Sequence, residues 1–245
     1  LAPVEIDRAG TECRVFLPLR NLPPQIAQRA QCCLVDAGFL ELVRYGLRGP
    51  DDPHILKSLP VVDSLLKVET PYGPAWHRYN HDGYGEKTDG SPFDGAGVGR
   101  AWPLLTGERG HYELATGHDP TPLVSALEGF ANSGGFLPEQ VWDEPNIPER
   151  DLYLGQGTGS ATPLVWAHAE YLRLLRSIRD GRVFDLIEPV RRRYVEERVR
   201  TNLAICKPNH RIRTLRAAQG LRIEVYAPAV LHWTRDAWAS VHDDL

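Results

Sequence analysis

Several features are missing from this sequence of 245 residues, and each absence narrows what the chain can be. No apolar run approaches the ~20 residues that a membrane-spanning helix needs, which argues against a transmembrane protein. Basic residues are not in excess: 28 Lys and Arg against 32 Asp and Glu give a net charge of −4, so the electrostatic signature of a nucleic-acid-binding protein is absent. Methionine is absent, and the chain begins Leu1-Ala2-Pro3 without the charged and apolar regions of a signal peptide. We therefore expect the numbered start to be a processed end or a cut within a longer chain.

Cysteine is scarce as well. The chain has Cys13, Cys32, Cys33 and Cys206, which are too few for a disulfide framework in so long a sequence. The adjacent pair cannot easily bond to itself, and no Cys or His spacing fits a zinc site. We expect buried free thiols, which favours a reducing, cytoplasmic location only slightly and leaves localisation open.

The composition, with 42% hydrophobic and 24% charged residues, is typical of a globular chain, and the pattern of apolar residues is mainly helical. Apolar residues recur at helical spacing, with helices expected over 25–35, 39–47, 53–66, 102–115, 122–130 and 163–178. Asp52 followed by Pro53 is typical of a helix start, and Pro60 predicts a kink. The arginines at 191–193 lie among glutamates and indicate a solvated helix face.

Other parts of the chain break this helical pattern. Residues 71–99 and 132–162 crowd glycine and proline together with aromatic and charged residues, and long irregular stretches in a compact domain are usually functional. A β-like run covers 13–19. After Thr201 the pattern changes to an alternation of apolar and polar residues, which predicts small antiparallel strands over 211–215, 221–225 and 230–233.

Common catalytic signatures do not fit the irregular stretches. The glycines at 155, 157 and 159 are followed by no lysine and preceded by no strand, so they indicate a tight turn before a helix and not a nucleotide site. His77 and His81 lie four residues apart without a third ligand, and no Gly-x-Ser-x-Gly occurs. We therefore expect neither a metal site nor a cofactor.

The irregular stretches do bring carboxylates together with aromatic rings. Sugar rings stack their C–H faces on aromatic side chains, and their hydroxyls take polar partners. Hydrolysis of a glycosidic bond needs two carboxyl groups, one on each side of that bond. Composition favours a carbohydrate site but does not choose among the acids, because most Asp and Glu side chains are solvated or capping.

Four longer motifs are more specific than the composition. They are Arg78-Tyr79-Asn80-His81-Asp82-Gly83-Tyr84-Gly85, the run Arg100–Gly110 (RAWPLLTGERG), the run Leu137–Asp143 (LPEQVWD) and the run Ser160–Ala169 (SATPLVWAHA). In this order they resemble the later part of a bacterial glycoside hydrolase family 15 enzyme, the family of glucoamylases and glucodextranases. The resemblance covers roughly residues 30–235. It implies part of an (α/α)6 barrel and inverting, exo-acting release of glucose from the non-reducing ends of α-glucans.

The resemblance also implies roles for individual residues. Glu139 resembles the general base that activates water, and Arg78 resembles the arginine that hydrogen-bonds the terminal glucose. Trp102 resembles the pocket tryptophan, and Trp166 lies where the family has a tryptophan near the base. We place the remaining candidates for substrate binding in the same loops, namely Tyr79, Asp82, Tyr84 and Trp142. For Arg78 the alternative is a salt bridge that pins the loop, and for Trp102 and Trp166 it is core packing.

The sequence departs from the family pattern in two ways. No motif resembles the general acid, which lies far N-terminal to the base in the family, and the helices are too few for twelve. We therefore expect residues 1–198 to be the C-terminal part of the barrel, carrying the base but not the acid, and residues 199–245 to be a small β-rich element. The expected partners are an α-glucan and the missing N-terminal part of the barrel, in the same or a separate chain.

Alternative functions stay open at this point. An α-1,6-specific, glucodextranase-like enzyme would share the same fold. A non-catalytic carbohydrate-binding derivative would keep the pocket without the acid. The sequence does not decide the linkage, the oligomeric state or calcium binding.

Overall fold

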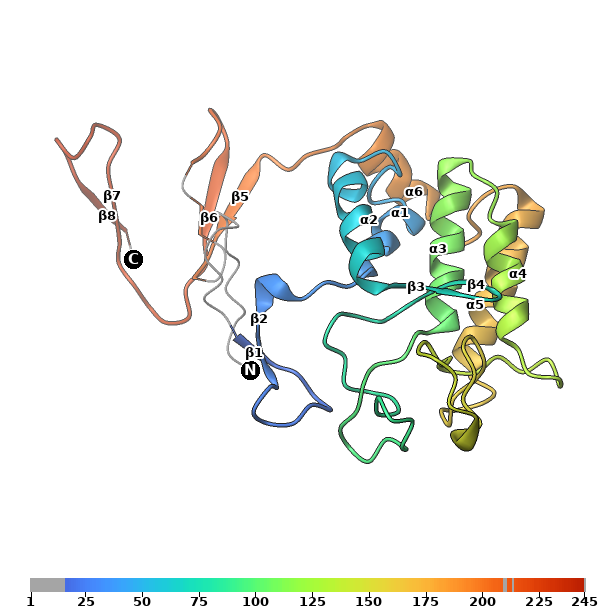
Figure 1. Cartoon of the computed structure of the whole chain (residues 1–245). Helices are drawn as coiled ribbons and strands as arrows, with labels where there is room; N and C mark the ends of the chain where they lie inside the picture. Colours follow the sequence, from blue (N-terminus) through green and yellow to red (C-terminus); the bar gives the residue numbers. More distant parts are fainter. Residues whose placement is uncertain (1–15, 209–210, 213, 245) are drawn as a thin grey trace. The chain divides into compact units, whose positions relative to one another are not determined.

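The computed structural model describes residues 16–208, 211–212 and 214–244 as mainly helical, with small two-stranded sheets (Figure 1). The chain divides into two units. Phe16–Val199 form the helical unit, and the described residues from Arg200 onward belong to the other, the tail unit. Within the described ranges, no helix combines the length and the apolar character that crossing a membrane would require.

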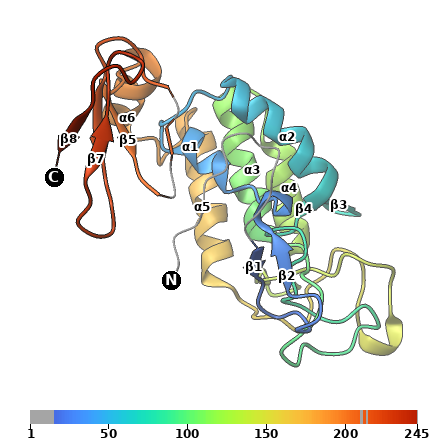
Figure 2. The same cartoon turned by 90° about the vertical axis from the view of Figure 1, so that its left-hand side faces the viewer.

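The helical unit is built around one central helix. Its helices are α1 (Glu41–Arg44), α2 (Pro53–Leu66), α3 (Pro103–Thr116), α4 (Thr121–Phe130), α5 (Val165–Asp180) and α6 (Glu188–Arg191), with 3-10 turns at Gln31–Cys33, Gly38–Leu40 and Pro148–Arg150 and a π-helical turn at Arg192–Glu196. The helices α1, α4 and α5 all pack against α3 (Figures 1 and 2). Two antiparallel hairpins pair β1 (Phe16–Pro18) with β2 (Gln28–Ala30) and β3 (Lys67–Thr70) with β4 (Gly73–Trp76).

Helix α2 follows its sequence signals closely. The Asp52 side chain accepts a hydrogen bond from the His54 N–H at 2.9 Å, and Pro53 occupies the first turn, where its missing N–H costs nothing. Apolar residues at 55, 62 and 66 are buried in a core cluster with Trp76 and Tyr112. A second row of apolar residues on α2, comprising Leu56, Val61 and Leu65, is exposed.

The close approach of α3 and α5 depends on two glycines of α3. A Cβ at Gly107 would lie 2.7 Å from Cγ of Glu170, and one at Gly110 would lie 2.5 Å from Cδ2 of Leu174. Contacts this short do not occur between real side chains, so both positions require glycine for the two helices to pack as they do. The glycines of the sequence motif at 100–110 thus serve packing.

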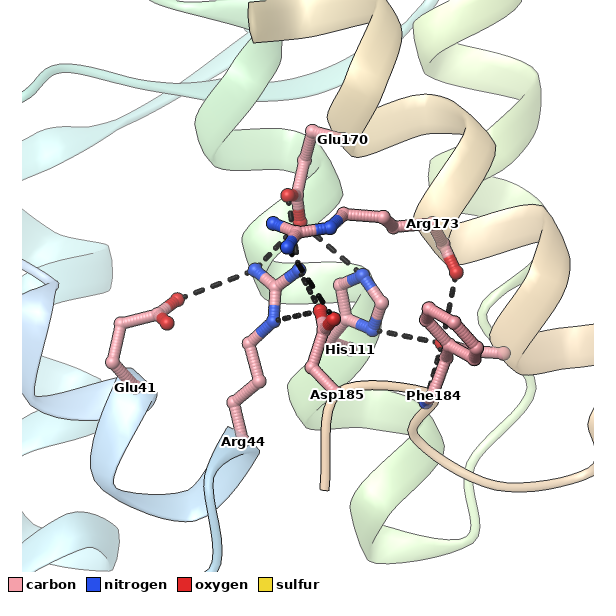
Figure 3. A network of polar contacts seen from close by, with 8 residues as sticks. Glu41, Arg44, His111, Glu170, Arg173, Phe184 and Asp185 are labelled. Carbon is pink, nitrogen blue, oxygen red and sulfur yellow. Dashed lines mark hydrogen bonds and ion pairs between the residues drawn. The ribbon is translucent and has the colours of Figure 1, made fainter. Parts of the chain in front are cut away.

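A buried polar network joins three helices and the segment after α5 (Figure 3). Arg44 of α1 is 4% exposed and donates to the two carboxylate oxygens of Glu170 on α5 at 2.9 and 3.1 Å. The same guanidinium donates to Asp185 at 2.6 and 3.0 Å. His111 of α3 lies 3.2 Å from Glu170 and 3.3 Å from Ser177. Because buried charges are costly unless paired, this network specifies how α1, α3 and α5 dock.

Glu108 of α3 adds a pH-sensitive group to this region. Burial, as the largest cause, together with the carboxylates of Glu41 and Glu170 raises its pKa from 4.5 to about 7, against the opposing effect of Arg44. The pKa of Glu108 is higher in the folded state than in the unfolded state, so the protonated carboxyl stabilises the fold. This contribution is complete below the unfolded-state pKa and is lost as pH rises through about 7. We expect Glu108→Gln to remove this loss and to be more stable than the parent well above pH 7 by ~2 kcal/mol, after allowance for partial solvent screening.

The measurement is thermal unfolding across this pH range, on the protein expressed at its full natural length. Glu188→Gln is the matched control, because its side chain is exposed and pairs with Arg182 at the surface. It should leave the pH dependence as it is in the parent. A Glu108→Gln variant with the parental pH dependence would show that Glu108 ionises freely in the folded protein.

The tail unit contains four short strands in two pairs. Strands β5 (Leu203–Cys206) and β6 (Gly220–Ile223) are parallel, and β7 (Leu231–Trp233) and β8 (His242–Asp244) are antiparallel. The expectation of a purely antiparallel tail is therefore wrong, because the long connection after β5 lets β6 run in the same direction. In the expected strand over 211–215, the described residues do not form a strand, and residue 213 lies outside the described part of the chain.

Two further expectations differ from the structure. The helix expected over 25–35 is wrong: β2 pairs with β1 there, and Ile26 of the supposed apolar face is exposed. The expectation of buried free thiols is also wrong for the described cysteines, since Cys32 is disulfide-bonded, Cys33 is free but exposed, and Cys206 is free and half-buried. The cysteines thus give no argument for a reducing compartment. Cys13 lies outside the described residues.

Candidate active site

Three irregular segments carry most of the candidate residues. We call residues 77–101 the arginine loop, residues 137–143 the central segment and residues 155–162 the glycine loop. The arginine loop connects β4 to α3, the central segment follows α4, and the glycine loop leads towards α5. The arginine loop thus runs directly towards α3, and the other two segments lie between α4 and α5.

The central segment is hydrogen-bonded to both neighbouring segments. The N–H of Glu139 donates to the C=O of Ala161 in the glycine loop at 2.8 Å. The N–H of Val141 donates to the C=O of Ala101 at the end of the arginine loop at 2.9 Å. These hydrogen bonds pair backbone groups of the irregular segment that would otherwise lack a partner. The structure thus fixes Glu139 between the two loops.

Glu139 has a direct partner in the arginine loop. The hydroxyl of Tyr84 donates to Oε2 of Glu139 at 3.1 Å. Burial and the nearby Glu139 carboxylate raise the pKa of Tyr84, so its hydroxyl stays a donor at neutral pH. Glu139 itself is half-buried, and no described residue donates to its Oε1. One carboxylate oxygen is therefore held in place while the other faces no protein donor in the described part of the chain.

The guanidinium of Arg78 lies close to three aromatic rings. Its Cζ is 5.6, 5.2 and 4.8 Å from the ring centroids of Tyr79, Tyr84 and Trp102. Its Nε and Nη2 donate to the two oxygens of Asp82 at 2.8 and 3.0 Å, and the Asp82 carboxylate is almost fully buried. Two of the five N–H groups of Arg78 are thus used, and the other three can face a ligand. The salt bridge that pins the loop is therefore present, and it orients the guanidinium while leaving three N–H groups for a ligand.

Asp143 connects the central segment to the arginine loop. Its Oδ1 accepts from Nη1 of Arg100 at 2.7 Å, and its Oδ2 accepts from the N–H of Ala101 at 3.0 Å. Arg100 is itself buried and lies over the ring of Trp142, with its Cζ 4.1 Å from the ring centroid. Nε2 of His77 lies 3.3 Å from Asp143 as well. These buried charges are paired with one another, as burial requires.

The structure brings most of the predicted residues together but not all. Arg78, Tyr79, Asp82, Tyr84, Trp102 and Glu139 form one contiguous set through the contacts above. Trp142 is 0% exposed and donates its Nε1–H to the C=O of Pro145, so direct contact between Trp142 and a sugar is excluded; its ring supports Arg100. Trp166, in the first turn of α5, is 57% exposed.

Three supporting residues were not identified from the sequence. Gln140 is buried and donates Nε2–H to the C=O of Tyr84 at 2.8 Å, and Glu86 accepts from the N–H of Gly159 at 2.7 Å. Asp143 is the third. Gln140 and Asp143 belong to the LPEQVWD motif, so their place beside Glu139 was a signal in the sequence that pointed to them. Nothing local marked Glu86, because its partner lies 73 residues away. Among the described residues, no group of three or more His, Cys, Asp or Glu side chains is arranged to hold a metal ion.

Comparison with known proteins identifies the family that the sequence resembles. Residues 11–176 match glycosyl hydrolases family 15. A glucoamylase from Clostridium sp. (strain G0005) is 54% identical over 162 residues, which is 66% of this chain and 22% of that protein. A crystal structure of a bacterial glucoamylase complexed with acarbose superposes with a TM-score of 0.67 at 50% identity and covers 74% of this chain and 25% of that one. The chain thus spans about a fifth of the curated relative, and the family match stops before the tail unit.

Proposed function

This chain belongs to glycosyl hydrolases family 15, and on that premise we propose that it supplies the general base and part of the sugar pocket of an inverting, exo-acting α-glucan hydrolase of the glucoamylase type. The observation that carries the proposal is the contact between Tyr84 and Glu139 beside the aromatic-lined Arg78. A carboxylate, a fork of donors and an aromatic ring meet there: the carboxylate is one of the two carboxyl groups that hydrolysis of a glycosidic bond requires, and the other groups are those that bind a sugar.

In this mechanism Glu139 removes a proton from a water molecule, and that water attacks the anomeric carbon opposite the leaving group. Inversion requires room for the water, so the general acid stands ~6.5–9.5 Å from the base. The hydroxyl of Tyr84 holds Oε2, which leaves Oε1 to take the proton. The proton then stays on Glu139 until it is released to solvent, while the acid protonates the departing sugar oxygen.

Arg78 and its neighbour Tyr79 bind the terminal sugar in this proposal. The N–H groups of Arg78 that Asp82 leaves unused donate to sugar hydroxyls, and Tyr79 offers apolar surface to the ring. Trp102 is only 4% exposed, so its ring supports the guanidinium of Arg78 and does not itself face the sugar. Asp82 acts through Arg78, since its carboxylate is buried against the guanidinium. Trp166 contributes from α5, where its exposed ring can contact a longer glucan.

The general acid comes from outside these residues. The other carboxylates near Glu139 are engaged: Asp82 by Arg78, Asp143 by Arg100 and Glu86 by the N–H of Gly159. We propose that an N-terminal part of an (α/α)6 barrel, in the same or a separate chain, supplies the acid and packs on the exposed apolar residues of the helical unit. This exposed set includes Leu56, Val61 and Leu65 on α2 and Val165 and Leu172 on α5.

The function is tested by the product that the protein releases at its full natural length. We expect β-glucose from the non-reducing ends of maltose and longer α-1,4-glucans, observed by NMR of the anomeric proton before mutarotation, and binding of acarbose. A faster reaction on isomaltose would indicate the α-1,6-specific alternative. Release of α-glucose would contradict inversion, and acarbose binding without any hydrolysis would indicate the non-catalytic derivative.

A further inference from the structure

Phe93 of the arginine loop packs against the ring of Tyr84, the residue that holds the proposed base. The two ring centroids are 5.2 Å apart and the ring planes meet at 77°, which is an edge-to-face arrangement. Aromatic pairs of this geometry attract each other beyond the area that they bury, because the positive edge of one ring meets the negative face of the other. Phe93 is half-buried, and the mechanism proposed above gives it no role.

The backbone of Tyr84 is hydrogen-bonded on both sides, but its side chain needs a support of its own. The N–H of Tyr84 donates to Oδ1 of Asp82 at 3.0 Å, and its C=O accepts from Nε2 of Gln140 at 2.8 Å. These bonds do not fix the side-chain torsions. The hydroxyl lies at the far end of the side chain, so a small rotation of the ring moves it away from Oε2 of Glu139, which it meets at 3.1 Å. Whatever holds the plane of the ring therefore also holds the base.

Phe93 differs from the other neighbours of this ring. Cζ of Arg78 lies 5.2 Å from the ring centroid of Tyr84, and the ring centroid of Trp102 lies 6.3 Å from it. In the proposed mechanism Arg78 binds the sugar and Trp102 supports Arg78, so both belong to the binding of substrate. The side chain of Phe93 has no polar atom, and its contact with the tyrosine ring is present without a ligand.

The phenyl ring comes from a turn at residues 87–94 that has its own anchors. The C=O of Lys87 accepts from the N–H of Gly90 at 2.9 Å and from Nη2 of the buried Arg100 at 3.1 Å. Gly90 has a φ of +73°, and a Cβ there would lie 2.9 Å from Cδ1 of Leu152, so the turn packs closely against that side chain. The phenyl ring is thus held against the tyrosine from a support outside the residues proposed to bind the sugar.

We propose that Phe93 is a positioning residue for the base, because it fixes the plane of the Tyr84 ring and thereby keeps the Tyr84 hydroxyl on Oε2 of Glu139. The inference rests on the proposed function and adds a residue that acts on the base through a second side chain. It concerns kcat more than KM, since the group at the end of this line of contacts takes the proton from water and does not bind the terminal sugar.

Three substitutions of Phe93 test the role of its ring in the protein at its full natural length. We expect Phe93→Ala to lower kcat on maltose about tenfold, with less than a twofold change in KM and in the Kd of acarbose, because the hydroxyl then leaves Oε2 for much of the time. Phe93→Tyr keeps the ring and should restore kcat to near the parental value. Phe93→Leu fills most of the space without a flat ring, so it should also lower kcat, and it serves as the test if Phe93→Ala does not fold.

Phe184→Ala is the matched control. It is the same chemical change in the segment after α5, where the ring of Phe184 lies against Arg176 with Cζ 4.8 Å from the ring centroid. It should leave kcat and KM unchanged. Thermal unfolding of every variant shows that the comparison is between folded proteins.

A double-mutant cycle with Tyr84→Phe shows whether Phe93 acts through the hydroxyl. Tyr84→Phe keeps the ring but lacks the O–H that donates to Glu139. Adding Phe93→Ala or Phe93→Leu to Tyr84→Phe should therefore lower kcat less than twofold further. Effects that multiply would overturn the inference, as would parental kcat in both Phe93→Ala and Phe93→Leu, or a loss of kcat in Phe93→Tyr as large as in Phe93→Ala. Absence of β-glucose release by the parent would overturn the proposed function instead.

Discussion

Replacing Glu139 by glutamine is expected to lower kcat about 10²–10⁴-fold, with little change in the affinity for a ground-state ligand. Glutamine has nearly the same size and shape, and it can still accept the hydrogen bond that Tyr84 donates to Oε2. Its amide cannot take a proton from water. The substitution therefore removes the proposed base while leaving the hydrogen-bonded frame around it, including the bond from the Glu139 N–H to Ala161.

The measurement is steady-state hydrolysis of maltose together with calorimetric binding of acarbose, on the full-length protein. Glu149→Gln is the control: it is the same chemical change in the 3-10 turn Pro148–Arg150, where Glu149 is exposed, and it should leave kcat and KM unchanged. A Glu139→Gln variant with near-parental turnover would remove Glu139 as the base. Loss of acarbose binding in the same variant would mean that the carboxylate serves binding and not proton removal.

Sequence signals at the helix starts correctly predicted α2, α3 and α4. The segment 53–66 was predicted with the bounds of α2, because Asp52 and Pro53 mark its start by local hydrogen bonding and backbone geometry. The helices expected over 102–115 and 122–130 lie within one residue of α3 and α4 for the same kind of reason, with a proline in the first turn of each. These signals act within one helical turn and therefore need no knowledge of the rest of the fold.

Signals that depend on distant partners were not visible in the sequence. Residues 25–35 have a helical spacing of apolar residues, yet β2 is extended because its backbone pairs with β1. The direction of β6 was missed in the same way, because alternation predicts a strand but not its partner. Tertiary pairing decided both cases over local periodicity.

The same contrast between local signals and distant partners applies to the candidate site. The motifs that resemble the family predicted roles for Glu139 and Arg78, and in the structure both side chains lie against Tyr84. The residues that hold this arrangement were not identified as such, because Asp143 meets its partners across more than forty residues. Burial was not visible in the sequence either: the ring of Trp142 is 0% exposed and lies under Arg100, and the ring of Trp102 is 4% exposed and lies against Arg78.

Removing the charge of Arg44 is expected to destabilise the helical unit by about 3–5 kcal/mol. Arg44→Met keeps the length and apolar stem of the side chain but leaves the carboxylates of Glu170 and Asp185 buried beside each other without their common cation. Arg173 also reaches Asp185, at 3.5 Å, but its side chain is 46% exposed and cannot replace the buried guanidinium. The cost therefore comes mainly from the uncompensated carboxylates, and the free energy of unfolding should recover partly at low pH as they take up protons.

A matched surface arginine distinguishes this effect from the mere loss of a charge. Arg48 pairs with Asp52 at 3.6 Å and is 58% exposed, so Arg48→Met should cost less than ~1 kcal/mol. Both variants are compared in the full-length protein by thermal unfolding and by hydrogen exchange of the amides of α1, α3 and α5. Because Arg44 joins α1 to α5 and to the segment after it, the faster exchange should concentrate in these elements and spare the central segment around Glu139. Equal effects of the two substitutions would show that the network in Figure 3 contributes no more to stability than an exposed ion pair.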